Sequence, residues 1–393
     1  MNWPSLRSQM LLDPTVTNLN TGSIAPLPRC VFERVTTLRQ RLAEEPLDFV
    51  LRQMPPLLWQ ARQRLAQFLG GRTDRLVFTT NVSAAINLVA SSLQLAAPGE
   101  ILLTDHEYGA MHWCFERTAQ RLGLTLRVVP VPALASDPQE FVDAIRPALN
   151  ERTRLLFFSH VLSHTGTIMP AKAICTEARK RGIITVLDGA HAPAMTPIAL
   201  DDMDCDFYGG NCHKWLLSPT GAGFLYLGRG NENRLQPLHV SWGYRPDPAK
   251  MDEPDEFGTT PRLRFLEFEG TRDICPWLTV PQAIDFQAGI GWDKIRERNL
   301  SLAHYARQKM AAIPHLRLHT PNHPDLHGYL TAFRLPANVQ PNDLRAFLWD
   351  RHRIEAPVIE RPESLLIRLS THFYNTEEEV NYLAEVLHKF LAK

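Results

Sequence analysis

The sequence has little of what marks disulfide-rich, zinc-binding or secreted proteins. Its cysteines are scattered and form no CxxC pair, so we expect neither a disulfide framework nor a metal site. They are Cys30, Cys114, Cys175, Cys205, Cys212 and Cys275. No apolar run is long enough to span a membrane, because Arg, Gln or Pro interrupts the richest ones. Residues 1–7 show no basic stretch that leads into an apolar one, so a cytoplasmic protein without a secretory signal is predicted.

An excess of charge of either sign is also missing. Lys and Arg together number 42, as do Asp and Glu, so the formal net charge is zero. This balance argues against a general binder of nucleic acid or membrane surfaces. Apolar residues make up 44% of the 393 positions, which is enough for one large domain and a smaller second one. We therefore expect a soluble, reduced, cytoplasmic enzyme.

What the chain does contain is an alternation of short apolar strands and amphipathic helices between residues 76 and 227. This alternation predicts an α/β fold with a mostly parallel, seven-stranded sheet that helices cover on both faces. Ligands of such sheets bind outside the carboxyl ends of the strands. From about residue 315 onward, further strands and helices indicate a smaller α+β domain.

Two segments interrupt this pattern. Residues 1–30 are rich in turn formers and are too polar for a core element, so they are predicted to form an arm that could cover a site. Residues 229–264 contain five prolines and are expected to form an excursion over the site or a subunit contact.

Two charged residues follow predicted strands at the centre of the pattern. Asp188 ends one strand, and Lys214 follows another that ends at Gly209 and Gly210. Pyridoxal 5'-phosphate (PLP) enzymes need a lysine that binds the cofactor covalently and an aspartate that keeps its pyridine nitrogen protonated. Considered alone, Lys214 is an ordinary strand-end lysine and Asp188 an ordinary turn former. Together, they predict a PLP site.

The phosphate of PLP needs a cradle of backbone N–H groups at the start of a helix. Residues 79–85 join a predicted strand to a predicted helix, and this junction places Val82 and Ser83 where such a cradle forms. An ordinary helix N-cap at Asn81 or Ser83 explains the same residues.

Other polar side chains near the strand ends complete the predicted cofactor site. Asn211 and His213 could add donors to the phosphate, and His191 could bond the phenolic oxygen of the cofactor. His106 is the first candidate to stack on the pyridine ring and Tyr108 the second. Each of these residues, taken alone, is also compatible with an ordinary loop or surface position.

Arg368 lies inside the apolar strand 365–370. A buried arginine is costly unless it is paired. Because the guanidinium fork matches a carboxylate, Arg368 is predicted to bind the carboxylate of an amino-acid substrate.

In this order, the motifs resemble those of the fold-type I PLP enzymes, specifically the class V aminotransferase superfamily. That group includes cysteine desulfurases, kynureninase and isopenicillin N epimerase, and the likeness is closest to the isopenicillin N epimerase-like branch. It extends from about residue 18 to 390 and rests on residues 18–23, 105–109, 188–193, 211–215 and 269–273. It implies the PLP-transferase fold, with an N-terminal arm at 1–18, a large PLP-binding domain at 19–285 and a small domain at 286–393.

The resemblance also implies a homodimer with shared active sites. Thr271 would reach the phosphate of the neighbouring subunit's cofactor, Arg368 matches the carboxylate-binding arginine, and Asn20 is assigned to the substrate. Ser163 stands where cysteine desulfurases have an asparagine that touches the cofactor, so this contact is weaker or made differently. Desulfurases also need a nucleophilic cysteine in the C-terminal domain, and no cysteine follows Cys275. This absence counts against a desulfurase.

We therefore predict a PLP-dependent enzyme that acts at Cα of an amino acid. Lys214 would remove the α-proton, and Asp188 would stabilise the resulting charge through the ring nitrogen. Epimerisation, C–S lysis (as in cysteine or hercynylcysteine sulfoxide lyases) and transamination all remain open, and the resemblance ranks epimerisation first. Epimerisation needs either an acid on the face opposite the lysine, for which His106 or Tyr108 is the candidate, or a lysine that can serve both faces. A non-catalytic binding protein is disfavoured, because the Lys, Asp and Arg set is intact.

Overall fold

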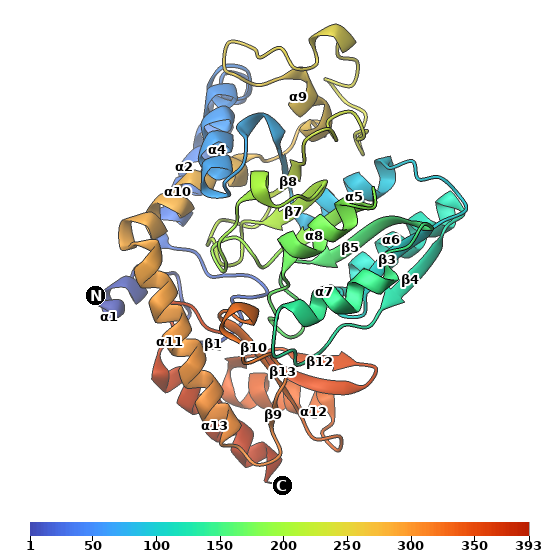
Figure 1. Ribbon diagram of the computed structural model, residues 1–393. Coiled ribbons are helices and arrows are strands. Elements are labelled where there is room, and N and C mark those ends of the chain that lie inside the picture. The colour runs from blue at the N-terminus through green and yellow to red at the C-terminus, as the bar shows by residue number, and fades with distance from the viewer. Residues whose placement is uncertain (393) are drawn as a thin grey trace.

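The computed structural model describes residues 1–392 and confirms the predicted α/β fold (Figure 1). The strands of its largest sheet are β2 (Leu76–Thr79), β3 (Glu100–Thr104), β4 (Thr125–Val129), β5 (Thr153–Ser159), β6 (Ile184–Gly189), β7 (Phe207–Asn211) and β8 (Gly223–Leu227). They lie in the order β2-β8-β7-β6-β5-β3-β4. Only β8 runs antiparallel to its neighbours, so the sheet is mostly parallel, as predicted.

Each face of this sheet packs against its own hydrophobic core. Leu102 and Leu156 belong to one core, whereas Leu103 and Phe157, one residue further along the same strands, belong to the other. Successive side chains of a strand point to opposite faces, so apolar strands are buried on both sides. The covering helices are α7 (Gln139–Ile145) and α8 (Ala171–Arg179) on one face, and α5 (Val82–Ser92) and α6 (Gly109–Leu122) on the other.

A group of helices packs beside the β2 edge of the sheet (Figure 1). It contains α2 (Arg29–Glu44), α3 (Pro46–Asp48), α4 (Met54–Phe68), α9 (Pro261–Glu267) and α10 (Cys275–Ile290). A buried ion pair ties this group to the sheet. Arg62 Nη2 lies 2.5 Å from Glu267 Oε1, and Glu267 Oε2 accepts from the N–H of Phe78 at 3.1 Å. None of the helices in residues 1–392 is long and apolar enough to cross a membrane.

The C-terminal part of the chain forms a second, smaller sheet with its own core. Its strands are β9 (Arg317–Leu318), β10 (Leu330–Arg334), β12 (Val358–Arg361) and β13 (Ser364–Ser370), in the antiparallel order β12-β13-β10-β9. The helices α11 (Trp292–Ala311), α12 (Pro341–Ala346) and α13 (Glu377–Leu391) accompany it. Thr376 and Glu379 form a capping box at the start of α13.

The N-terminal segment differs from the prediction. After the short helix α1 (Trp3–Arg7), the strand β1 (Thr17–Asn18) pairs in parallel with β11 (Ile354–Glu355) of the C-terminal part. Leu19 and Thr21 are fully buried, so the expectation that residues 1–30 contain no core element is wrong. The polar residues of this segment form hydrogen bonds with distant residues that no local sequence pattern predicts. For example, the Thr21 hydroxyl hydrogen-bonds Tyr374, 353 residues away.

Residues 229–264 have little regular structure, as their prolines predict. They contain a short 3-10 turn at Pro248–Lys250 before α9 begins. Val240 and Trp242 in this stretch are exposed to 71% and 86% of their surface. Large apolar side chains that remain this exposed are typical of surfaces that contact another molecule.

Candidate active site

Lys214 lies at the carboxyl edge of the large sheet, just after β7. Its Nζ is 3.1 Å from Nε2 of His191. Burial lowers the pKa of the Lys214 amine to about 7, the positive charge of Arg368 lowers it further, and Asp188 acts in the opposite direction. Much of the amine is therefore uncharged at neutral pH, which is the form that attacks a carbonyl or accepts a proton.

Asp188 lies in β6, directly beside the strand that leads to Lys214. It is in parallel register with Gly209 and is 4% exposed. Its Oδ1 accepts a hydrogen bond from the N–H of Ala190 at 2.8 Å. Burial raises the pKa of the Asp188 carboxyl, while the Ala190 N–H and the charge of Lys214 oppose that shift. A buried carboxylate with one hydrogen bond can accept a further, cationic partner.

The start of α5 has the form expected of a phosphate cradle. Asn81 caps the helix by accepting from the N–H of Ala84 at 2.9 Å, and Asn211 Oδ1 accepts from the N–H of Val82 at 2.8 Å. The predicted donor Asn211 therefore uses its oxygen to hold α5 against β7. Within residues 1–392, the amide and the hydroxyl of Ser83 have no protein partner, so both remain available to an anion.

Two histidines of the site have buried ring nitrogens without a hydrogen-bond partner. They are Nδ1 of His191 and Nδ1 of His213. Burial lowers the pKa of His213 to about 4 and that of His191 well below its usual value. Buried polar atoms are normally satisfied, so these two ring nitrogens are available to bond a ligand. Together with Lys214, Asp188 and Ser83, they fit PLP.

His106 lies between β3 and α6, outside both elements. The helix α6 begins only at Gly109, after the extended residue Tyr108. His106 is buried, and its Nδ1 lies 2.7 Å from Oδ1 of Asp105. An ionised carboxylate accepts only, so Nδ1 carries the proton and Nε2 is free to exchange one. Tyr108 is half-exposed at the start of the helix.

Arg368 is buried and has no carboxylate partner. Its Nη1 donates to the carbonyl oxygen of Ser163 at 2.6 Å, and its Nη2 donates to Asn20 Oδ1 at 3.2 Å and Ser23 Oγ at 3.1 Å. Its Nε has no partner. Burial lowers the pKa of Arg368 to about 10, and no acid of the described residues opposes that shift. The predicted residues Ser163 and Asn20 thus contact the guanidinium, and neither of them carries a negative charge.

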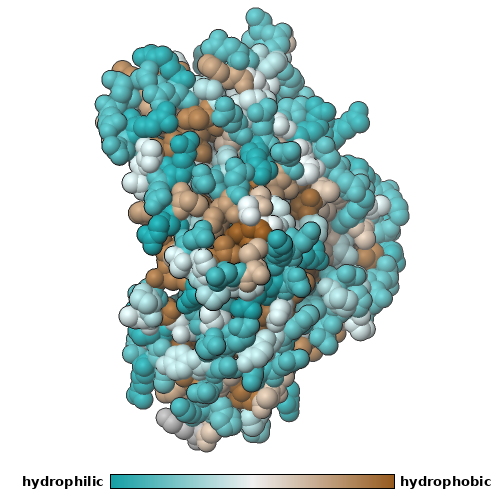
Figure 2. All heavy atoms as spheres, turned by 90° about the vertical axis from the view of Figure 1, so that its left-hand side faces the viewer, coloured by the Kyte–Doolittle hydropathy of each residue, from teal (hydrophilic) through white to brown (hydrophobic). Residues whose placement is uncertain are grey.

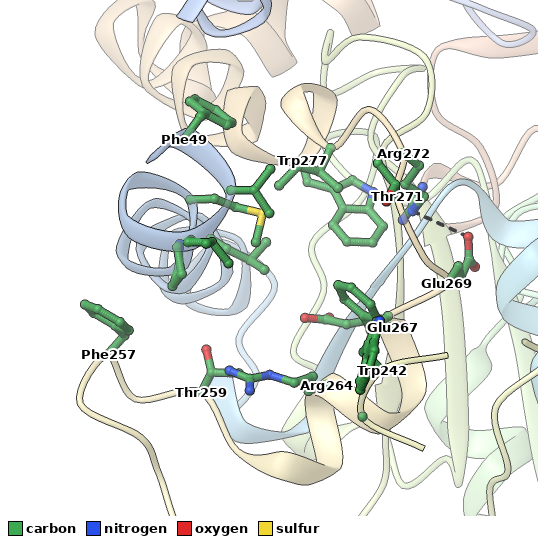
Figure 3. Close-up of a pocket in the computed structure, with 18 of the residues that line it drawn as sticks. Phe49, Trp242, Phe257, Thr259, Arg264, Glu267, Glu269, Thr271, Arg272 and Trp277 are labelled. Atoms are coloured by element: carbon green, nitrogen blue, oxygen red, sulfur yellow. Dashed lines mark ion pairs between the residues drawn. The ribbon is translucent and has the colours of Figure 1, made fainter. Parts of the chain in front are cut away.

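Thr271 is not brought to this site within one chain. It is exposed and lines a separate hollow of about 780 Å³ (Figure 3). Phe49 and Trp277 line the same hollow, whereas Lys214 and Asp188 do not. The nearby Arg272 lies over the ring of Trp277 at 3.9 Å and pairs with Glu269 at 3.4 Å.

Two side chains near the site were not assigned a role from the sequence. One is Ser23, whose hydroxyl contacts Arg368. The other is Glu107, a buried acid that accepts from Ser159 Oγ at 2.6 Å and from Thr104 Oγ1 at 2.5 Å. Burial raises the pKa of Glu107 to about 7. In the sequence, only the position of Glu107 next to His106, shortly after a strand, could have identified it as a site residue.

Comparison with known proteins gives a family and a fold. The family model described as Aminotransferase class-V matches residues 27–383. The chain is 56% identical over 390 residues to the isopenicillin N epimerase of Amycolatopsis lactamdurans and 55% identical over 389 residues to that of Streptomyces clavuligerus. Both alignments cover 98% of each protein. A cysteine desulfurase of Escherichia coli is 30% identical over 84% of this chain and 81% of its own length.

Solved structures share the fold. The cystine C–S lyase C-DES, in complex with its product cysteine persulfide, superposes with a TM-score of 0.83 over 98% of this chain and 99% of its own. A C-DES mutant with glycine covalently linked to its PLP cofactor gives the same TM-score over 98% of each chain. Both are 23% identical to this chain, which supports a common fold and no closer relation.

Proposed function

The chain belongs to the class V aminotransferase family and is a PLP-dependent enzyme, and from this premise we propose that it epimerises an amino-acid substrate at Cα, as an isopenicillin N epimerase. The proposed reaction is supported by the sequence identity of 55–56% to two isopenicillin N epimerases over nearly their whole length. Cysteine desulfurases match far less closely, at 26–32%. The chain also has no cysteine after Cys275 to serve as a desulfurase nucleophile.

Arg368 is proposed to bind the α-carboxylate of the substrate. Its guanidinium is buried without an acid, and it is already oriented by Ser163, Asn20 and Ser23. A carboxylate that enters this position completes a charge-assisted pair at no cost in reorienting the arginine. Such an anchor fixes the substrate so that its Cα–H bond faces the same proton acceptor in every turnover.

The proton chemistry is assigned to Lys214, Asp188 and His191. When bound, PLP supplies an electron sink that stabilises negative charge at Cα. Lys214 Nζ would take the α-proton, since burial keeps much of this amine uncharged. Asp188 would hold the negative charge that pairs with the ring nitrogen of the cofactor, and His191 would orient the Lys214 amine across the 3.1 Å contact.

We propose that inversion uses a proton donor on the face opposite Lys214 and that His106 is this donor. Asp105 fixes its Nδ1–H, so Nε2 can give and regain a proton. The same arrangement orients the ring for stacking on the cofactor. Tyr108, half-exposed at the start of α6, remains the second candidate.

Incubation of the PLP-loaded enzyme with amino acids in deuterated water tests the proposed reaction. We expect the α-proton of a substrate to exchange for deuterium with inversion at Cα. Chiral chromatography detects the inversion, and mass spectrometry detects the deuterium. His106→Gln should slow inversion by about 100-fold or more while exchange with retention continues at Lys214. Release of pyruvate and sulfur without inversion would establish a C–S lyase, and accumulation of a keto acid would establish an aminotransferase.

We further propose that the active form is a homodimer in which Thr271 serves the neighbouring site. Apolar patches lie on the side of the molecule where α2 and α10 are found (Figure 2). Leu47, Leu51 and Trp242 are exposed to 67%, 62% and 86%, and the hollow lined by Thr271 lies among these segments. A second copy that covers this face would bury the apolar side chains and bring its own cofactor to Thr271.

Mixing two inactive variants tests this shared site. Thr271→Ala should weaken PLP binding enough to leave its own dimer inactive at a limiting PLP concentration, and Lys214→Ala should abolish catalysis. If Thr271 acts across the interface, half of the randomly reassociated dimers contain one intact site. Activity should then return to about a quarter of the wild-type level. No recovery, despite mixed dimers demonstrated by mass spectrometry, would place Thr271 outside the neighbouring site.

A further inference from the structure

The amide of Asn20 lies between the positive charge of Arg368 and the negative charge of Glu355. Its Oδ1 accepts from Arg368 Nη2 at 3.2 Å, and its Nδ2 donates to Glu355 Oε1 at 2.9 Å. Asn20 is 9% exposed, and Glu355 is half-buried. One neutral side chain therefore joins the two charged groups.

The chemistry of these two neighbours allows the amide only one orientation. A guanidinium only donates hydrogen bonds, and an ionised carboxylate only accepts them. The Asn20 oxygen must therefore face Arg368, and its NH2 group must face Glu355. The reverse orientation would set donor against donor and acceptor against acceptor, so both hydrogen bonds would be lost in a buried place.

The hydroxyl of Ser23 takes its orientation from the same amide. Ser23 Oγ donates to Asn20 Oδ1 at 2.8 Å and accepts from Arg368 Nη2 at 3.1 Å. Because its single proton is directed to Asn20, a lone pair of the hydroxyl faces the guanidinium. Both acceptors of Arg368 Nη2 thus depend on the amide that Glu355 holds.

Backbone pairing brings Glu355 to this position. The strands β1 and β11 are parallel, with Asn18 in register with Glu355, and the N–H of Leu19 donates to the Glu355 carbonyl oxygen at 3.0 Å. The N–H of Asn20 donates in turn to Asn18 Oδ1 at 3.0 Å. The pairing of the two chain ends therefore sets the distance between the Glu355 carboxylate and the Asn20 amide.

The place of Glu355, one side chain away from Arg368, keeps the guanidinium open to a substrate. An acid paired with Arg368 itself would occupy N–H groups that the proposed α-carboxylate needs. Glu355 instead contacts Asn20, and Arg368 Nε has no protein partner. Burial lowers the pKa of Arg368 to about 10, and no acid of residues 1–392 opposes that shift.

From this arrangement we propose that Glu355 is a positioning residue for substrate binding. Its carboxylate fixes the amide of Asn20, and through it the hydroxyl of Ser23, so that both present oxygen to Arg368. The inference rests on the proposed function, because it concerns the carboxylate anchor assigned to Arg368. It gives Glu355 a role beyond that of a link that holds the N-terminal segment on β11.

Equilibrium binding to the PLP-loaded enzyme tests the proposal, with the change in cofactor absorbance as the readout. Alanine, norleucine and glutamate are each compared with the amine that lacks only the α-carboxylate, namely ethylamine, pentylamine and 4-aminobutyrate. In the wild type, we expect at least one amino acid to bind about tenfold more tightly than its amine. Glu355→Gln should reduce this ratio about fivefold and leave amine binding within about twofold, because glutamine both donates and accepts and no longer fixes the amide.

A double variant separates orientation of the amide from a structural link. Asn20→Ala should itself reduce the acid-to-amine ratio, and adding Glu355→Gln should reduce it no further, since no amide is left to orient. Glu360→Gln is the matched control, because Glu360 is an exposed acid on β12 that pairs with Arg345. It should leave the ratio unchanged. A further reduction in the double variant, or equal loss of acid and amine binding in Glu355→Gln, would overturn the proposal.

Failure of the proposed function gives a different result. A wild-type enzyme that prefers no amino acid over its amine would remove the carboxylate anchor and this inference with it. A clear wild-type preference that Glu355→Gln leaves unchanged would overturn the role of Glu355 alone. Because binding is measured without turnover, failure of the epimerase assignment appears separately, in the deuterium-exchange assay.

Discussion

Lys214→Ala is expected to yield a folded protein that no longer binds PLP covalently and that has lost at least about 10³-fold in activity. Among the lysines of residues 1–392, only Lys214 lies beside both Asp188 and His191 at the sheet edge. Its replacement removes both the proposed covalent tether and the proposed acceptor of the α-proton. Two measurements check this result: loss of the visible absorbance of the lysine-bound cofactor, and loss of cofactor that borohydride can fix to the protein.

Lys172→Ala provides the control for this experiment. Lys172 is exposed and pairs with Asp202 on the surface, so its loss should change neither absorbance nor activity. Circular dichroism should show that both variants keep the wild-type fold. Cofactor that remains fixed by borohydride in the Lys214→Ala protein would show that another lysine carries PLP and that the central assignment is wrong.

Arg368→Lys should raise KM for amino-acid substrates on the order of 100-fold while cofactor binding changes little. A lysine keeps the charge but loses the fork that Ser163, Asn20 and Ser23 orient, and a lost charge-assisted pair at a buried site costs about 2–3 kcal/mol. Steady-state kinetics and PLP titration check the two halves of this expectation.

Arg307 offers a matched control for Arg368, since it is also buried and its Nη1 and Nε contact only neutral groups. It lies on α11 and donates to Thr331, with no contact to Lys214 or Asp188. Arg307→Lys should lower thermal stability without changing KM. If both variants raised KM equally, the effect of Arg368→Lys would reflect disturbed packing, and the carboxylate assignment would be withdrawn.

The sequence was sufficient for the large sheet and for the two residues at its centre. Strand-ending Asp188 and strand-following Lys214 could be brought together because parallel strands present their carboxyl ends at one edge. The prediction that Asp188 and Lys214 lie close together therefore needed only the parallel arrangement of the strands. Arg368 could be singled out because a charged residue in an apolar strand needs a partner.

The rest of the site depends on contacts between distant parts of the chain. The N-terminal segment was predicted to lie outside the core, yet Asn20 and Ser23 contact Arg368 across more than 340 residues. No local pattern encodes such pairs. The structure also divides the helical region that follows residue 281: α10 ends at Ile290, and Gly291, which has a φ of 103°, makes the turn before α11.

The N-terminal segment also has a consequence for the order in which the molecule is assembled. Residues 17–23 are among the first to be synthesised, but their partners are Ile354, Glu355, Arg368 and Ser370, which are among the last. During translation, residues 17–23 therefore remain unpaired until nearly the whole chain has left the ribosome. The proposed binding place for the substrate carboxylate therefore forms only when both ends of the polypeptide meet. A partly synthesised chain that already contains the carboxyl edge of the large sheet still lacks this place.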